Sequence, residues 1–299
     1  MSVVVAGEAL VDLILRPDGS LTAAAGGGPF NAARTLGRLG IETSFLGGLA
    51  DDRFGHLLRD RLLADGVRLA MPDLLPLPTT LALAELDEQG AASYQFYFDH
   101  TAAPAVTDAD AHGAVDAGTR VLHVGTLGLL LEPMATSLER LVADVADSVL
   151  VFVDPNCRPR VVPDRDAYVE RLHRVLARAD VVKVSGDDLD YLAPGQDLVE
   201  AARALLGLAP RVVLFTDGGK AVHVITAAGS ASGTAQRHPR LIEVMAIGGQ
   251  RPVVDCEGFP QQHTQIGRRI DLPSDLGRPV EVSGDSIQTE RVAAARAKR

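Results

Sequence analysis

The sequence predicts an α/β fold built on a mainly parallel sheet that is flanked by helices. Three observations carry this prediction. Short, continuous apolar runs recur along the chain, helical patterns lie between them, and this alternation occupies the first 231 of 299 residues. Continuous apolar strands are typical of a parallel sheet that is buried on both faces, and strands that alternate with helices predict βαβ units.

The strands are expected where mainly apolar runs of four to six residues lie between turn residues. Six runs of this kind are Val3–Ala6, Val121–Val124, Val149–Val153, Val181–Val184, Val212–Phe215 and Val222–Ile225. Apolar residues recur at helical intervals in four segments, Phe30–Leu39, His56–Leu63, Met134–Val149 and Asp166–Ala179. Because such sheets bind ligands at the carboxyl ends of their strands, polar residues that follow a strand are candidates for a site.

Two segments depart from this rhythm and predict a small β-flap. Residues 13–22 and 79–98 look like antiparallel strands, and Asp87–Gly90 supplies the turn of a hairpin within the second segment. Alternation puts Tyr97 on one face and the other flap aromatics on the opposite face, namely Tyr94, Phe96 and Phe98. One face is expected to cover a ligand as a lid, and the other to pack on a second copy in a homodimer. An ordinary surface hairpin is the alternative.

The composition limits the partners and the compartment. A net charge of −10 argues against nucleic acid as a partner, although it leaves room for a small anionic ligand. No apolar run reaches the roughly 18 residues of a membrane span, and no basic region precedes an apolar stretch at the N-terminus. Cys157 and Cys256 show neither metal-ligand spacing nor a disulfide framework. We therefore expect a cytoplasmic protein without a membrane partner.

The end of the chain differs in composition from the rest. Residues 1–231 carry 19 Lys and Arg against 31 Asp and Glu, whereas residues 232–299 carry 10 against 8. Eleven of the twelve aromatic residues precede residue 232, and six of the nine glutamines follow it. We therefore predict an α/β domain with a flap over residues 1–231 and an atypical C-terminal segment over residues 232–299.

Candidate ligand-binding residues follow the first strand and open the first long helix. Asp12 lies shortly after the first strand, where a carboxylate can accept hydrogen bonds from the hydroxyls of a sugar. The glycines of Gly26–Gly28 let the backbone approach a ligand, and Asn31 can both donate and accept. A glycine-rich turn with a capping Asp is the structural alternative. Gly7-Glu8-Ala9 lacks the Gly-x-Gly-x-x-Gly pattern, which disfavours a nicotinamide-dependent enzyme.

Three later strands also end in polar or glycine-rich turns. Asp154–Arg158 combines an acid, an amide and a guanidinium, and Lys183–Asp188 follows the next strand. Thr216–Gly219 can offer hydroxyl and amide donors to a phosphate. Each turn alone reads equally well as a surface turn or ion pair. Because parallel strands end at one edge of a sheet, the turns together predict one polar crevice.

In their order and spacing, these motifs resemble the ribokinase or PfkB family of carbohydrate kinases over about residues 1–231. The resemblance includes the strand-end turns, the Gly26–Asn31 signature and the stretch Gly47–Gly55. Tyr94–Tyr97 and Thr101-Ala102 are most similar to fructokinase-type members. The resemblance implies a ribokinase-like α/β fold with a lid. It also implies ATP-dependent phosphorylation of a small-molecule sugar, with ATP and Mg²⁺ as cofactors.

The resemblance also implies roles for single residues. The sugar would be held by Asp12, Gly27, Gly28, Asn31 and Arg158, with Phe96 leaning on it from the lid. The nucleotide would lie against Lys183, Ser185, Thr216 and Gly218, and the metal site would use Asp188. Three positions depart from the family pattern: Ser185 stands in place of Asn, Asp188 in place of Glu, and Ala221 in place of a glycine.

The second signature of the family, Asp-Thr-x-Gly-Ala-Gly-Asp, is missing. Its glycine amides form an anion hole, and its last Asp is the catalytic base. The nearest string here is Met245–Arg251, which puts Arg251 at the base position, and arginine cannot act as a base at neutral pH. Either a shifted reading frame or divergence would account for residues 232–299. The resemblance thus implies a sugar kinase with impaired catalysis, and the alternative is a non-catalytic sugar- or nucleotide-binding protein on the same scaffold.

Overall fold

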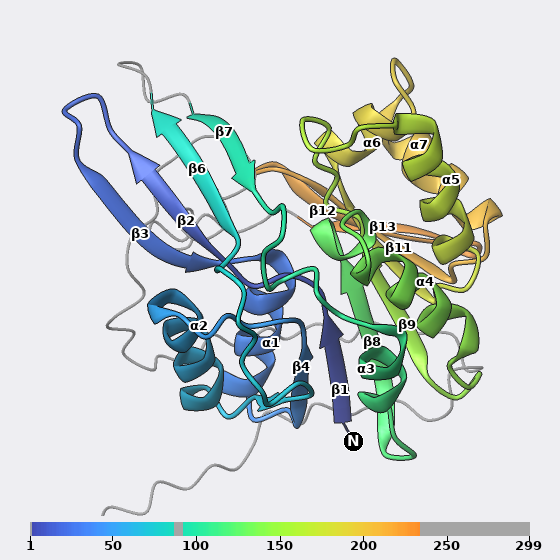
Figure 1. Cartoon of the computed structure of the whole chain (residues 1–299). Helices are drawn as coiled ribbons and strands as arrows, with labels where there is room; N and C mark the ends of the chain where they lie inside the picture. The colour runs from blue at the N-terminus through green and yellow to red at the C-terminus, as the bar shows by residue number, and fades with distance from the viewer. Residues whose placement is uncertain (1, 87–91, 234–299) are drawn as a thin grey trace, which may run out of the picture. The chain divides into compact units, whose positions relative to one another are not determined.

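The computed structural model describes residues 2–86 and 92–233, which form two sheets with helices around the larger one (Figure 1). The strand order of the larger sheet is β13-β12-β11-β10-β9-β8-β1-β4-β5. Its parallel strands are β1 (Ser2–Ala6), β4 (Thr43–Leu46), β5 (Arg68–Leu69), β8 (Thr119–Gly125), β9 (Leu150–Asp154), β10 (Val181–Ser185) and β11 (Val212–Asp217). The antiparallel edge strands are β12 (Ala221–Thr226) and β13 (Gly229–Gly233). The predicted α/β sheet is thereby confirmed.

The run Val222–Ile225 is a strand, but it is not part of the parallel set. It belongs to β12, which pairs antiparallel with β11 across the short turn at Gly218–Lys220. A parallel connection needs a crossover of a dozen or more residues, so a turn of this length dictates the antiparallel direction.

All four predicted helices are present in the described residues. They are α1 (Gly28–Arg38), α2 (Arg53–Ala64), α4 (Met134–Asp144) and α5 (Arg165–Leu176). α4 ends before the predicted Val149 because Val145 already has extended backbone angles. The sequence did not predict the short helices α3 (Asp108–Gly113), α6 (Gly186–Leu192) and α7 (Leu198–Ala204) or the 3-10 turns η1 (Thr126–Leu129) and η2 (Leu205–Gly207). Six or seven residues are too few to display a helical apolar period.

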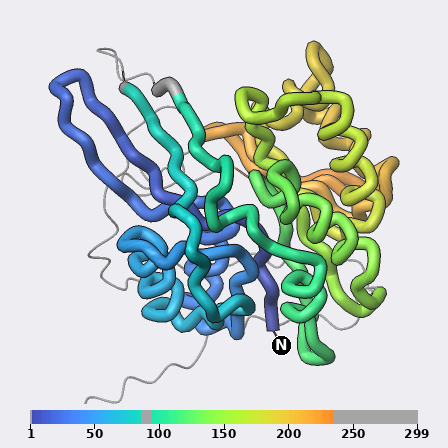
Figure 2. Tube along the Cα trace, viewed as in Figure 1, coloured from blue at the N-terminus to red at the C-terminus, as the bar shows by residue number. Residues whose placement is uncertain are grey.

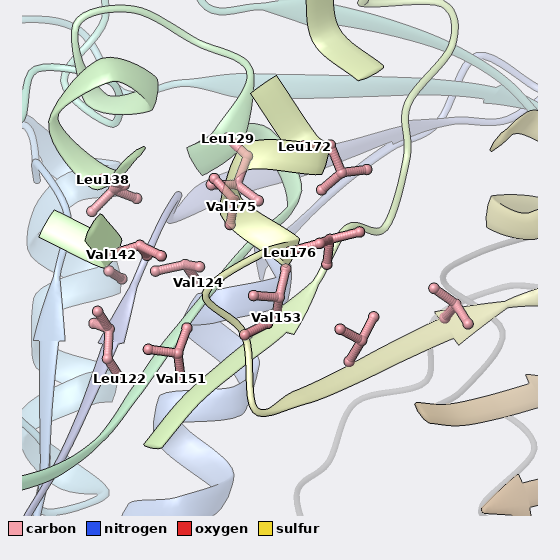
Figure 3. Close-up of a cluster of buried hydrophobic side chains, with 14 of the residues drawn as sticks. Leu122, Val124, Leu129, Leu138, Val142, Val151, Val153, Leu172, Val175 and Leu176 are labelled. Atoms are coloured by element: carbon pink, nitrogen blue, oxygen red, sulfur yellow. The ribbon is translucent and has the colours of Figure 1, made fainter. Parts of the chain in front are cut away.

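The larger sheet is buried on both faces, as its continuous apolar strands predict. Alternate residues of β1 enter two different cores: Val4 and Ala6 enter one, Val3 and Val5 the other. In the first core, β8 and β9 pack against α4 and α5 through residues that include Leu122, Val124, Val151, Val153, Leu138, Val142, Leu172, Val175 and Leu176 (Figure 3). The second core packs α1 and α2 on the opposite face, and Figure 2 shows these helices with the flap on one side of β1.

The flap is the four-stranded sheet β3-β2-β6-β7. Its strands are β2 (Leu10–Leu15), β3 (Leu21–Gly26), β6 (Leu81–Leu86) and β7 (Ala92–Tyr97). β2 and β6 pair in parallel, and each has an antiparallel outer partner. The predicted limits 13–22 were too narrow, because pairing begins at Leu10 with Gly26 and both residues are buried. The predicted turn Asp87–Gly90 lies outside the described residues.

The wider limits change the place of Asp12. It lies inside flap strand β2, not directly at the end of β1 as the sequence pattern indicated. Cross-strand pairing puts Asp12 in one row with Ala24, Ala82 and Phe96, so all four share one face of the flap. Tyr97 lies on the other face and is 46% exposed, as alternation predicts.

The C-terminal segment predicted over residues 232–299 lies outside the described residues, except for Ser232 and Gly233 at the end of β13. None of the described helices has the length and apolar character needed to cross a membrane.

Leu122 should be one of the residues on which the first core depends. Its side chain is fully buried between β8 and the helices, so Leu122→Ala is expected to cost about 2–5 kcal/mol of unfolding free energy. Leu39 is 70% exposed, so Leu39→Ala is the control and should change the stability by less than about 0.5 kcal/mol. Urea unfolding followed by circular dichroism measures both. Equal losses in the two variants would show that the β8 face is not the core described above.

Candidate active site

The strand-end turns singled out in the sequence lie along one edge of the larger sheet. The neighbouring strands β11, β10, β9, β8 and β1 are parallel, so their carboxyl ends point the same way. The ends are also level in register, because Gly125 pairs with Asp154 and Ser185 pairs with Thr216. The residues that follow these strands therefore meet on one side of the sheet.

The glycine turn lies directly against Asp12. A Cβ atom at Gly26 would collide with Asp12 Oδ2. Gly27 has a φ of +111°, and a Cβ there would lie 2.6 Å from the backbone oxygen of Glu8. Both positions therefore require glycine, one for space and the other for conformation as well. Pro29 then stands in the first turn of α1, where proline is well tolerated.

A chain of hydrogen bonds joins the loops after β8 and β9. Asn156 Nδ2 donates to Thr126 Oγ1 at 3.2 Å, and Arg158 Nη1 donates to Asn156 Oδ1 at 2.7 Å. Thr126 and Asn156 both have positive φ values, 56° and 40°, which cost energy in residues other than glycine. A Cβ at Gly28 would lie 2.7 Å from Thr126 Oγ1 and 3.4 Å from Asn156 Nδ2. These hydrogen-bonded side chains therefore border the glycine turn, and they hold the guanidinium group of Arg158.

The charges of this cluster influence one another. Burial raises the pKa of Asp12 to about 6, and the positive charge of Arg158 opposes the rise. Burial likewise raises the pKa of Tyr94, with Asp12 adding to the rise and Arg158 opposing it. The acid from β2, the phenol from β7 and the guanidinium after β9 therefore face a common region. Acceptor and donor groups arranged in this way suit the hydroxyl groups of a polyol.

Phe96 and Asn31 lie at the borders of this region. Phe96 shares its row of the flap with Asp12 and stacks on Tyr94, with ring centroids 6.4 Å apart. Asn31 is exposed in the first turn of α1, and its backbone N–H donates to the Gly27 carbonyl at 3.0 Å. The structure thus brings Asp12, Gly27, Gly28, Phe96 and Arg158 together, with Asn31 one helical turn away. Their contacts with a sugar remain a prediction.

The predicted nucleotide residues lie at the ends of the next two strands. Lys183 Nζ pairs with Asp154 Oδ2 at 3.1 Å, and Thr216 Oγ1 donates to the Val184 carbonyl at 3.4 Å. Gly218 has a φ of +51° in the turn between β11 and β12. Successive amides in such a turn can form a concave anion site, so a phosphate would suit these residues.

Asp188 is held inside the protein. It is 2% exposed, its Oδ1 accepts the Cys157 backbone N–H at 2.6 Å, and its Oδ2 accepts the backbone N–H of Ser185 at 2.8 Å. Ser185 caps α6 in return, and the two residues form a capping box. Both carboxylate oxygens therefore accept hydrogen bonds from the protein, and these bonds fix the position of the side chain. The predicted metal role of Asp188 stays a prediction.

No group of three or more His, Cys, Asp or Glu residues within residues 2–86 and 92–233 is arranged to hold a metal ion. Arg251, the residue at the predicted base position, lies outside the described residues, as does the whole string Met245–Arg251.

Sequence reasoning missed three residues of the cluster. Thr126 had only its place after a strand as a signal, and Asn156 stood within a highlighted turn without a role. Glu8 also stood within a quoted motif, yet it is 1% exposed and its Oε1 accepts the Gly28 backbone N–H at 3.0 Å. Only the folded structure brings these residues beside the glycine turn.

Comparison with known proteins identifies the family of this chain. The pfkB family carbohydrate kinases match residues 1–247 of the chain. A fructokinase of Rhizobium leguminosarum bv. trifolii is 35% identical over 216 residues, which cover 71% of this chain and 66%, just under two thirds, of that protein. Fructokinase-2 of Zea mays is 31% identical and is covered to 69%, with 74% of this chain aligned.

Solved structures agree with the sequence relatives. A fructokinase from Xylella fastidiosa with bound ATP superposes with a TM-score of 0.68 at 27% identity, over 77% of this chain and 76% of that one. A fructokinase from Vibrio cholerae with fructose, ADP and calcium bound gives 0.68 at 26% identity, over 78% and 76%.

The fold and the strand-end cluster therefore define a ribokinase-like α/β protein with a β-flap. The chain belongs to the pfkB family of carbohydrate kinases, and the two relatives described above are fructokinases. The resemblance recognised from the strand-end motifs is confirmed.

Asp188 offers a test of its structural role. Asp188→Ala would leave the buried Cys157 and Ser185 amides without an acceptor, so the unfolding free energy should fall by about 1–3 kcal/mol per group in magnesium-free buffer. The control is Asp187→Ala, an exposed neighbour in the same helical turn, which should cost less than about 1 kcal/mol. Urea unfolding measures both. A loss that appears only when Mg²⁺ and nucleotide are present would instead assign Asp188 to the metal.

Proposed function

We propose that the protein transfers the γ-phosphoryl group of ATP to a hydroxyl of a sugar, with fructose as the first substrate to test. One observation carries the proposal: Asp12 and Arg158 face a common region beside a glycine turn, under a flap that carries Phe96. The two relatives compared by sequence are fructokinases, and the Vibrio cholerae structure contains fructose and ADP.

Each residue of the cluster has a distinct part in this proposal. The Asp12 carboxylate would accept hydrogen bonds from sugar hydroxyls, and Arg158 would donate to a sugar oxygen. Gly27 and Gly28 would lie against the sugar through their backbone atoms, and Asn31 would bind it from the first turn of α1. Phe96 would cover an apolar side of the ring, which is the usual place of an aromatic residue against a sugar.

Lys183, Ser185, Thr216 and Gly218 are the residues we propose for the nucleotide. They lie in or just after β10 and β11, the two strands next to β9, which Arg158 follows. ATP would supply the phosphoryl group, and a divalent cation, which we take to be Mg²⁺, would neutralise its charge. Lys183 is paired with Asp154, and this ion pair orients its ammonium group along this edge of the sheet.

A positioned base is the missing part of the proposal. The string that aligns with the family base has Arg251 in its place, and the family match ends at residue 247. We therefore propose that sugar and nucleotide binding are retained while turnover is slow. A sugar-binding protein without catalysis is the second candidate, because it needs only the residues around Asp12 and Arg158.

The second face of the flap belongs to a separate proposal. Tyr97 is 46% exposed and Leu21 is 58% exposed, and we propose that this apolar surface is covered by a second copy of the chain. The absence of a nucleic-acid or membrane partner and the cytoplasmic location stay predictions from the sequence.

Asp12→Asn tests sugar binding. Loss of the charged acceptor should weaken fructose binding by about 1–3 kcal/mol, as measured by calorimetry. Since the folded pKa of Asp12 is about 6, wild-type affinity should fall as the pH is lowered through 6, where the carboxylate takes up a proton. Asp18→Asn, at the exposed tip of the same hairpin, is the matched control and should bind as wild type does. Equal affinity of wild type and Asp12→Asn for a sugar that binds would remove Asp12 from the site.

A coupled ADP-release assay with a panel of hexoses tests turnover. A positioned base contributes about 10²–10⁴-fold to such reactions, so the rate should fall below the common enzyme range of about 1–10³ s⁻¹. A rate within that range would contradict the proposed impairment, and Asp255→Asn would then show whether that carboxylate serves as the base. Fructose binding without any ADP release would favour the non-catalytic candidate.

A further inference from the structure

Glu8 is a buried acid whose role the proposed function leaves open. It lies in the turn after β1 and is 1% exposed. Its Oε1 accepts the Gly28 backbone N–H at 3.0 Å, whereas its Oε2 accepts no hydrogen bond from the described residues. A buried carboxylate oxygen without a donor is costly. Packing alone would therefore favour an apolar residue at this position.

The N-terminus of α1 explains what Glu8 supplies. The N-cap residue is Gly27, which has no side chain to cap the helix, and the first turn contains no acidic residue. A capping Ser or Asp cannot replace Gly27, because its Cβ would lie 2.6 Å from the Glu8 carbonyl. Glu8, twenty residues earlier in the chain, therefore provides the oxygen that a capping side chain would normally provide. Its negative charge also suits the positive end of the helix.

The surroundings of Glu8 contain one positive charge. Arg158 lies in the loop after β9, and its charge opposes the rise in the pKa of Glu8. The same charge opposes the rise in the pKa of Asp12 in β2 and of Tyr94 in β7. The first turn of α1 and η1 contribute no ionisable side chain. Burial outweighs Arg158 and the nearby backbone amides, and it raises the pKa of Glu8 to about 7.

We propose that Glu8 is a positioning residue of the sugar site: its carboxylate holds Gly28 and the first turn of α1 in the geometry that binds the sugar. This inference rests on the proposed sugar-binding function. Glu8 acts through the backbone, because its bond goes to the Gly28 amide, which borders Thr126 and Asn156. Loss of the charge should loosen the turn and weaken sugar binding.

The contribution of Glu8 to stability should change with pH in the direction opposite to its effect on sugar binding. The pKa of Glu8 is about 7 in the folded protein against 4.5 for an ordinary glutamate, so folding disfavours the ionised form. The contribution of Glu8 to stability therefore falls as the pH rises from about 4.5 to 7. Glu8→Gln removes this loss, so its melting temperature relative to wild type should rise between pH 5 and pH 8. A residue that only stabilises the fold would give no such opposition between stability and binding.

The experiment compares wild type, Glu8→Gln and the control Glu170→Gln, whose side chain is 77% exposed on α5. Hydrogen exchange without sugar should be faster over residues 26–36 in Glu8→Gln alone. At pH 8 its fructose affinity should be about tenfold weaker, which corresponds to about 1.4 kcal/mol. Wild-type affinity should fall as the pH drops through 7, whereas Glu8→Gln should keep only the fall near 6 that Asp12 causes.

Unchanged exchange over residues 26–36, or a fructose pH profile identical to that of wild type, would overturn the inference. If wild type binds no fructose, the proposed function fails, and exchange together with the melting profiles still decides whether Glu8 holds the turn. Should Glu8→Gln not fold, Glu8→Asp takes its place, because it keeps the charge but is one methylene too short for Gly28. In Glu8→Asp, hydrogen exchange over residues 26–36 should be faster than in wild type, while the melting temperature should depend on pH as it does in wild type. Exchange as slow as in wild type would refute the inference.

Discussion

The close approach of three loops at the glycine turn is the constraint on which the rest of the site depends. Between the turn after β1, flap strand β2 and the loop after β8 there is no room for a Cβ atom at Gly26, Gly27 or Gly28. The helix that begins there cannot carry its own capping side chain, so a carboxylate from another loop caps it. The same lack of side chains lets Asp12 and Thr126 pack directly against the backbone of the turn. One steric condition thus explains both the cap of the helix and the close packing of Asp12 and Thr126 on the glycine turn.

The electrostatics of the site follow from this packing. Close approach excludes water, and burial raises the pKa of Glu8 to about 7 and that of Asp12 to about 6. Two acids with raised pKa values near a single arginine are less stable than apolar residues of the same size would be. Such groups are concentrated where binding or catalysis requires them. The cost in stability is therefore itself an argument that the region around Asp12 is a binding site.

Much of the fold could be predicted because its signals are local. The buried strands are continuous apolar runs, and the four long helices show their apolar stripe, so both appear in the sequence. The sequence pattern did not place Asp12 within β2, because the start of this strand depends on the pairing of Leu10 with Gly26, sixteen positions along the chain. Thr126 and Glu8 could not be given roles, because their partners, Asn156 and Gly28, lie far from them in sequence. The structural contacts of Asp188 could not be predicted either, because two of its three hydrogen-bond donors are backbone amides, and one of these belongs to Cys157, thirty-one positions earlier in the chain.

The turn Asp154–Arg158 lies between the residues proposed for the sugar and those proposed for the nucleotide. Arg158 and Asn156 are hydrogen-bonded toward the glycine turn through Thr126, while Asp154 pairs with Lys183 and the Cys157 amide bonds to Asp188. The turn therefore contacts η1 on one side and both β10 and α6 on the other, because β9 lies between β8 and β10 in the sheet. The positive φ of Asn156 is sustained by hydrogen bonds at both ends of its side-chain amide, so the cost of this backbone conformation is offset by the contacts that join neighbouring strand ends.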